Sequence, residues 1–119
     1  METAAAWLGG QLKELAGKAV SIDYGESRIT ETVDGDALKG WCSRQQYDVM
    51  DSEGFATSVM SYDWQFVLAE LPEDLLKFAN VAVNNGTERF EAMPIGSRPW
   101  FERLDTSGQL ITIHTKQVN

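Results

Sequence analysis

An Asn-Asn-Gly sequence between two β-forming runs constrains the fold of this chain more than any other feature. Residues 80–83 precede Asn84-Asn85-Gly86, and residues 87–93 follow it. Asn-Gly between two such runs is the strongest short-range signal for a β-hairpin, because both residues tolerate the positive φ that tight hairpin turns require. The chain is therefore expected to build an antiparallel sheet.

Further runs with a period of two lie on both sides of this hairpin. Residues 18–24 and 28–33 predict a hairpin around Gly25-Glu26, and residues 100–104 and 110–115 predict another. The remaining strand candidates are residues 38–49, which form either one bent strand or two short ones, and residues 55–60 and 64–69, which Ser61-Tyr62-Asp63 separates. A turn is expected at residues 51–54.

Helical patterns are few. Residues 4–16 predict a short N-terminal helix, because Leu8, Leu12 and Leu15 recur on one face. Residues 72–78 predict a helical turn that begins at a proline. We therefore expect a mainly β (α+β) fold: a small antiparallel barrel or sandwich of about seven strands with an N-terminal helix. The length predicts a single domain, residues 1–119, whose β-rich body spans residues 18–118.

Charge and composition exclude several classes of protein. The chain has 10 basic and 18 acidic residues and a net charge of −8, which disfavours binding to nucleic acid or to anionic lipid. Cys42 is the only cysteine, so no internal disulfide can form. The N-terminus lacks the pattern of a signal peptide, and no apolar run reaches the roughly 20 residues that span a bilayer.

Residues that could carry chemistry are sparse. The sequence has no phosphate-binding glycine motif, and one cysteine with one histidine cannot make a typical zinc site, so no cofactor is expected. His114 could serve a small hydrolase, but no nucleophile motif accompanies it, and a half-exposed strand histidine is the simpler expectation. Cys42 is expected to be a buried, inert thiol.

One charge pattern points to a partner. From Gln45 to Leu76 the chain has seven acidic residues and neither lysine nor arginine. This stretch is either a solubilising face or a docking surface for a basic partner or the basic side of an identical subunit. Because binding residues concentrate on loops, the loops at residues 51–54 and 95–100 are expected to reach neighbours. The candidate interface residues are Asp48, Asp51, Glu53, Asp63, Arg98, Trp100 and Arg103.

Three segments resemble a known family. In residues 62–72 a charged residue is followed by a β-run and then a proline, and these residues resemble the segment with the same order in the head–tail joining, or neck, proteins of tailed bacteriophages. Residues 80–93 resemble the hairpin of that family that enters its last sheet. Pro99-Trp100-Phe101 through Asp105, with residues 111–116, resembles its closing pair of strands.

The resemblance implies a structural neck protein without enzyme activity. It implies a small barrel-like sheet with an N-terminal helix, assembled as a ring of identical subunits between the portal side of the capsid and the tail. The expected partners are identical subunits, portal or adaptor proteins and tail proteins, with no specific nucleic acid and no membrane. The expected location is the virion neck, after synthesis in the bacterial host cytoplasm. The residues alone leave two alternatives open: an acidic immunity or inhibitor protein that binds a basic partner, and a small hydrolase that uses His114.

Overall fold

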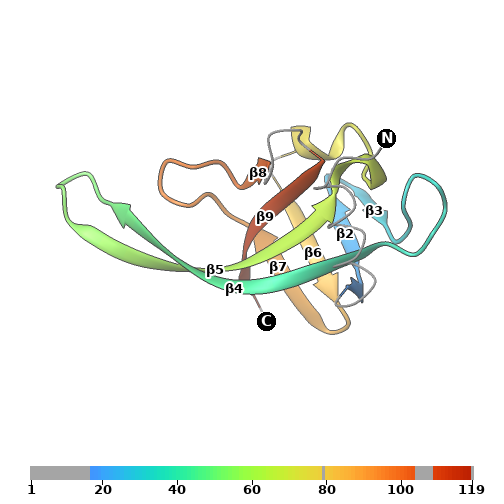
Figure 1. Cartoon of the computed structure of the whole chain (residues 1–119), viewed down its shortest axis with the longest axis horizontal. Helices are drawn as coiled ribbons and strands as arrows, with labels where there is room; N and C mark the ends of the chain where they lie inside the picture. The colour runs from blue at the N-terminus through green and yellow to red at the C-terminus, as the bar shows by residue number, and fades with distance from the viewer. Residues whose placement is uncertain (1–16, 79, 104–108, 119) are drawn as a thin grey trace.

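The computed structural model describes residues 17–78, 80–103 and 109–118 of the chain (Figure 1). The helix predicted at residues 4–16 lies outside these residues. The described strands are β1 (Lys18–Ala19), β2 (Ser21–Tyr24), β3 (Ser27–Ile29), β4 (Lys39–Met50), β5 (Ala56–Val67), β6 (Val81–Asn85), β7 (Glu88–Ala92), β8 (Phe101–Arg103) and β9 (Leu110–Gln117). Two short 3₁₀ helices, η1 (Leu68–Glu70) and η2 (Leu75–Lys77), follow β5.

All paired strands are antiparallel and form a nine-stranded sheet in the order β1-β4-β5-β9-β7-β6-β2-β3. β7 and β8 pair with the same edge of β9: β8 pairs with residues 111–113 and β7 with residues 115–117. The mainly β, antiparallel prediction is confirmed, but the closed-barrel prediction is wrong, because the end strands β1 and β3 do not pair with each other. The chain bends at buried Val20, so that β1 pairs with β4 while β2 pairs with β6.

The two longest strands bear on the predicted breaks. β4 is one strand, which agrees with the first of the two alternatives expected at residues 38–49. β5 runs unbroken through Ser61-Tyr62-Asp63, where two short strands were expected, so that prediction is wrong. The pairing from Trp41↔Gln65 to Met50↔Ala56 is continuous. Polar residues do not interrupt β5, because Ser61 and Asp63 point to the face opposite Tyr62 and find hydrogen-bond partners there. The strand ends at Val67, two residues before the predicted end.

The hairpin predictions are confirmed. β2 and β3 turn at Gly25-Glu26, where Gly25 has a φ of +58°. In the β6–β7 hairpin Asn85 pairs with Glu88, so the two-residue turn is Gly86-Thr87 and both asparagines belong to the strand. Gly86 supplies the positive φ, +63°, that the first turn position needs. β8 and β9 pair as the third predicted hairpin.

The core lies on one side of the β5–β9 region. Ile111 and Ile113 of β9 face it, in register with Phe66 and Trp64 of β5. Leu75 of η2 is fully buried in the same core, which confirms the helical turn predicted at residues 72–78. Thr112 and His114 point to the opposite face, yet they are buried as well, so β9 is covered on both sides.

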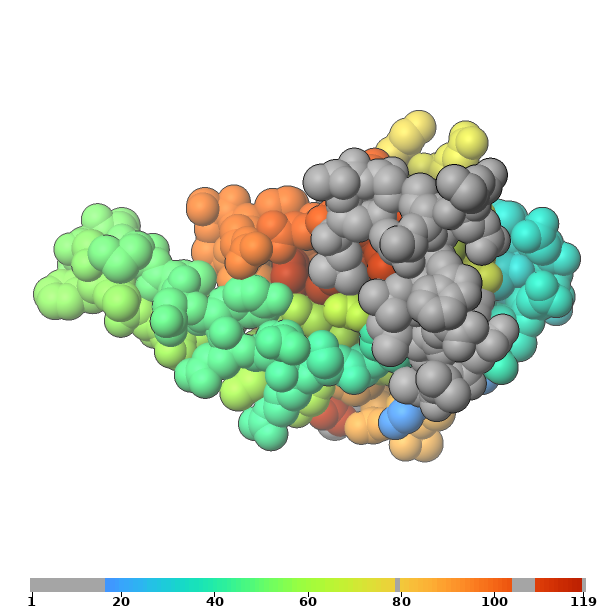
Figure 2. All heavy atoms as spheres, in the orientation of Figure 1, coloured from blue at the N-terminus to red at the C-terminus, as the bar shows by residue number. Residues whose placement is uncertain are grey.

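One feature extends away from this body. The outer parts of β4 and β5 project as a two-stranded arm, which forms the green hairpin at the left of Figures 1 and 2. We define the arm as residues 45–61, the part of the hairpin beyond the last β5–β9 pair, Tyr62↔Thr115. No helix in the described part of the chain is long and apolar enough to cross a membrane.

Candidate functional site

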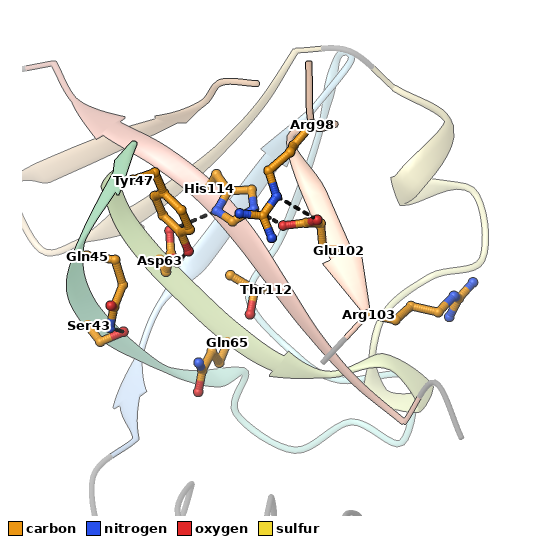
Figure 3. Close-up of a pocket in the computed structure, with 10 residues that line it drawn as sticks. All are labelled: Ser43, Gln45, Tyr47, Asp63, Gln65, Arg98, Glu102, Arg103, Thr112 and His114. Carbon is orange, nitrogen blue, oxygen red and sulfur yellow. Dashed lines mark hydrogen bonds and ion pairs between the residues drawn. The ribbon is translucent and has the colours of Figure 1, made fainter. Parts of the chain in front are cut away.

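A polar groove of about 300 Å³ lies on the sheet face opposite the core (Figure 3). Strand register determines which side chains line it. Asp63 of β5 stands directly opposite His114 of β9, and Ser43 of β4 stands opposite Asp63 on the other side. In the next row Thr112 lies between Gln65 and the β8 residue Glu102. The sheet thus brings one histidine between carboxylates that come from two other strands.

His114 is the centre of the groove and is only 1% exposed. Its Nδ1 lies 2.9 Å from Asp63 Oδ1, and its Nε2 lies 2.7 Å from Glu102 Oε2. Only the imidazolium form has an N–H on both nitrogens to donate to both carboxylates. Burial opposes this charge, but the hydrogen bonds to Asp63 and Glu102 outweigh it, so the pKa of His114 lies above its usual value. The prediction of a half-exposed strand histidine is therefore wrong.

Asp63 accepts hydrogen bonds from three side chains. Besides His114, the hydroxyls of Ser61, at 2.5 Å, and Tyr47 donate to its carboxylate. Burial alone would raise the pKa of Asp63, but these donors more than offset that effect and lower it. Tyr47 is affected in the opposite sense: burial and its hydrogen bond to Asp63 raise the pKa of its phenol. At neutral pH Asp63 is therefore a carboxylate and Tyr47 a donor.

Arg98 extends the network to the loop before β8. Its Nε donates to Glu102 Oε1 at 3.1 Å, and its guanidinium lies 5.2 Å from the centre of the Tyr47 ring. Although burial opposes it, the pKa of Glu102 is lowered by the hydrogen bonds from His114 and Arg98. The four charged groups, two acidic and two basic, balance. The network therefore connects β4, β5, β8, β9 and the loop around Arg98.

This arrangement is suited to fixing segments in place rather than to catalysis. Both nitrogens of His114 are occupied by carboxylates, so neither is available to take a proton from a nucleophile. Within residues 17–78, 80–103 and 109–118, no group of three or more His, Cys, Asp or Glu side chains could hold a metal ion. The geometry thus gives no support to the hydrolase hypothesis.

Comparison with known proteins identifies the family. A family model described as "Phage head-tail joining protein" matches residues 1–119. The chain belongs to this family. No curated protein and no solved structure matched the chain. Membership confirms the resemblance found in the sequence and places the chain among structural proteins that act between the head and the tail of a phage.

The predicted interface residues of this head-tail joining family member lie in two places. Asp63, Arg98 and Arg103 line the groove, although Asp63 is buried rather than at the surface. Trp100, beside them, is half-buried and packs against Phe101, with ring centres 4.7 Å apart. The other three, Asp48, Asp51 and Glu53, lie on the arm and are exposed. Their role in binding stays a prediction.

Sequence reasoning missed three members of the network and misplaced Cys42. Glu102, Tyr47 and Ser61 were not singled out, because only the register of distant strands brings them to His114 and Asp63. One signal was available: a lone histidine that alternates with isoleucines in a closing strand is expected to need a carboxylate if it is buried. Cys42 is exposed, so the prediction of a buried thiol is wrong.

The network predicts that the protein loses stability at both high and low pH, through different groups. Because the folded pKa of His114 is raised, its contribution to stability is complete below pH 6.5 and is lost as pH rises through the folded value. The contributions of Asp63 and Glu102, whose folded pKa values are lowered, are lost as pH falls below 3.8 and 4.5, their usual values. We expect urea midpoints to fall on both sides of this range.

Replacing His114 isolates its contribution to the pH dependence of stability. In His114→Gln the decrease above pH 6.5 should disappear, because the substituted side chain does not titrate, and the wild-type and variant curves should converge as pH rises. Urea unfolding followed by tryptophan fluorescence at several pH values measures this. Parallel curves for the two proteins across that range would contradict a charged His114.

Proposed function

We propose that this protein is a structural component of the phage neck that assembles as a ring of identical subunits and joins the portal side of the capsid to the tail. The observation that carries the proposal is the family match over residues 1–119. Identical subunits with unlike surfaces on their two sides form rings when the rotation between them closes. The proposal gives the protein no enzyme activity and no cofactor.

The arm supports this proposal. Both loops predicted to reach neighbours lie in or beside the arm. Residues 51–54 form the turn of the arm. Ile95–Arg98, in the other loop, line a small cavity with Asp48, Val49 and Met50. A hypothetical Cβ on Gly96 would lie 3.0 Å from Val49 Cγ1, so the loop packs closely on one face of the arm. These loops would extend from the body toward a neighbouring subunit.

Partners and location follow from the same proposal. Apart from identical subunits, the protein would contact portal or adaptor proteins on one side and tail proteins on the other. It would be made in the cytoplasm of a bacterial host and would then reside in the virion neck. Neither nucleic acid nor membrane is a specific partner in this proposal, since the net charge of −8 repels both phosphate surfaces.

Mass measurement in solution tests the proposal. We expect light scattering coupled to size-exclusion chromatography to give a mass several times that of the 13.3 kDa chain, either alone at high concentration or with portal and tail proteins. Electron microscopy of the same fractions should show closed rings. A monodisperse monomer under all of these conditions would count decisively against ring assembly.

The exposed acidic residues of the arm keep one alternative open. Asp48, Asp51 and Glu53 could mask the basic site of a toxin, as an immunity or inhibitor protein does. Such a protein would bind one basic partner tightly, and its association rate would fall steeply with salt. Tight, salt-sensitive binding to a single toxin would favour this alternative over the neck protein.

A further inference from the structure

The arm is a two-stranded ribbon that lacks support at its edges. β1 covers only Lys39 and Gly40 of β4, and β9 covers β5 only from Tyr62 onward. Within the described residues, the outer edges of residues 45–50 and 56–61 have no strand partner. An isolated two-stranded hairpin is marginally stable in water. A ribbon of this kind gains stability when another protein covers it.

Among the residues that the structure describes, only one face of the arm is covered by another segment. Val49 and Tyr47 point to the face that packs on Gly96 and Arg98. The alternation of side chains places Met50 and Met60 on the opposite face, which we call the open face. Met50 is 66% exposed and Met60 is 42% exposed, while Phe55 in the turn is 67% exposed. The arm thus carries three of the large apolar side chains that are exposed in the described part of the chain, which favours a role for it in contacts with a partner.

The open face continues into a groove at the base of the arm. This basal groove, about 260 Å³, is lined by Lys18, Cys42, Arg44, Tyr62, Trp64 and Glu88, among others. Lys18 and Arg44 are cations and Glu88 is an anion, so the lining carries a net positive charge. The Nε of Arg44 also contacts Met60 Sδ, at 3.3 Å. The indole N–H of buried Trp64 has no acceptor in the described part of the chain. This donor is buried beneath the groove, so what the groove offers a partner is positive charge over an aromatic floor.

The tip of the arm has the complementary chemistry. Asp48, Asp51 and Glu53 make it acidic, and Met50 and Phe55 add exposed apolar surface. The acidic tip is attracted to Lys18 and Arg44, and the apolar side chains fit beside the aromatic floor. We propose that the arm tip of one subunit docks into the basal groove of the next identical subunit. This inference rests on the proposed ring and specifies which surfaces of neighbouring subunits touch in it.

The contact must form between subunits. Cys42 in the groove lies near the start of β4 and Ser52 at the tip lies two residues beyond its end, and the eight residue steps from Cys42 to Met50 span roughly 26 Å of extended strand. A disulfide or a short crosslink cannot bridge that distance within one hairpin. Because tip and groove are different surfaces, the contact is heterologous and can repeat around a ring.

Crosslinking tests the contact directly. Cys42 is the only native cysteine and is exposed, so Ser52→Cys creates one defined pair per interface and leaves Phe55 and the acidic residues in place. We expect a short bifunctional maleimide to give a covalent ladder of dimers, trimers and larger species. Ser27→Cys, an exposed serine on the far edge strand β3, is the matched control and should give no ladder. Cys42→Ser in the Ser52→Cys protein should abolish it.

The outcomes separate this inference from the proposed function. A ladder that extends beyond dimers supports the contact. Dimers alone would overturn it, because they indicate a two-fold contact. Rings seen by electron microscopy without a ladder would overturn the contact but leave the ring. Absence of both rings and ladder, alone and with portal and tail proteins, would overturn both. If a portal or tail protein covers the arm tip and another subunit does not, the tip belongs to that partner instead, and the contact between subunits is overturned.

Charge exchange gives an independent readout. Lys18→Glu with Arg44→Glu should weaken self-association about tenfold, and Asp48→Lys with Glu53→Lys should do the same. Mixing the two variants should restore part of the assembly, because each then supplies the charge that the other lacks. Glu26→Lys with Asp34→Lys, which changes two exposed turn acids away from the arm, is the control and should assemble normally. Failure of the mixture to recover any assembly would contradict the contact.

Discussion

Asp63→Ala should lower the free energy of unfolding by about 3–5 kcal/mol, the usual loss when one partner of a buried ion pair is removed. Asp63 is 3% exposed and accepts hydrogen bonds from His114, Ser61 and Tyr47. Without the carboxylate, the two hydroxyls lose their acceptor and the imidazolium retains only Glu102. Urea unfolding at pH 7 measures the loss as a lower midpoint with an unchanged slope.

A second aspartate of the same hairpin is the control. Asp48 accepts a hydrogen bond from Ser58 at 3.0 Å but is exposed, so Asp48→Ala should change stability by no more than about 0.5 kcal/mol. Equal losses in the two variants would mean that the charge of the hairpin matters and that burial does not. A loss below about 1 kcal/mol in Asp63→Ala would contradict the ionised network.

Leu75→Ala is the second substitution with a large expected effect, a loss of about 2–5 kcal/mol. The η2 turn is too short to be stable alone, since its backbone makes only a few local hydrogen bonds. Leu75 is 0% exposed and inserts into the core beside β5 and β9, so its removal leaves a cavity and releases the turn.

The neighbouring lysine isolates the role of burial. Lys77→Ala changes an exposed residue of the same turn and should alter stability by no more than about 0.5 kcal/mol. Thermal and urea unfolding of both variants should rank them in this order. If Leu75→Ala unfolds at the wild-type midpoint, η2 is not part of the cooperative core.

The sequence predicted what local chemistry determines. The hairpins at Gly25 and Gly86 follow from turn residues that need a positive φ, and the structure has both. The antiparallel class follows from the same turns. The family resemblance was carried by short segments in the second half of the chain, and the family match covers all of it.

What the sequence did not reveal depends on residues far apart along the chain. Asp63 and His114 are 51 positions apart, and only the β5–β9 register brings them together. The same register turns Ser61 and Asp63 from a predicted break into an ordinary part of a long strand. The open sheet was also missed, because the bend at Val20 and the failure of the end strands to pair leave no local pattern.

The position of β9 has a consequence for the order in which the protein can fold. β9 lies between β5 and β7 in the sheet, although it follows both along the chain. During synthesis its flanking strands leave the ribosome before it, and they cannot join one another until residues 110–117 arrive. Such distant pairings make folding slow relative to chains with local contacts. Until then the edges of β5 and β7 remain open, so the nascent chain is most exposed to aggregation just before its central strand is made.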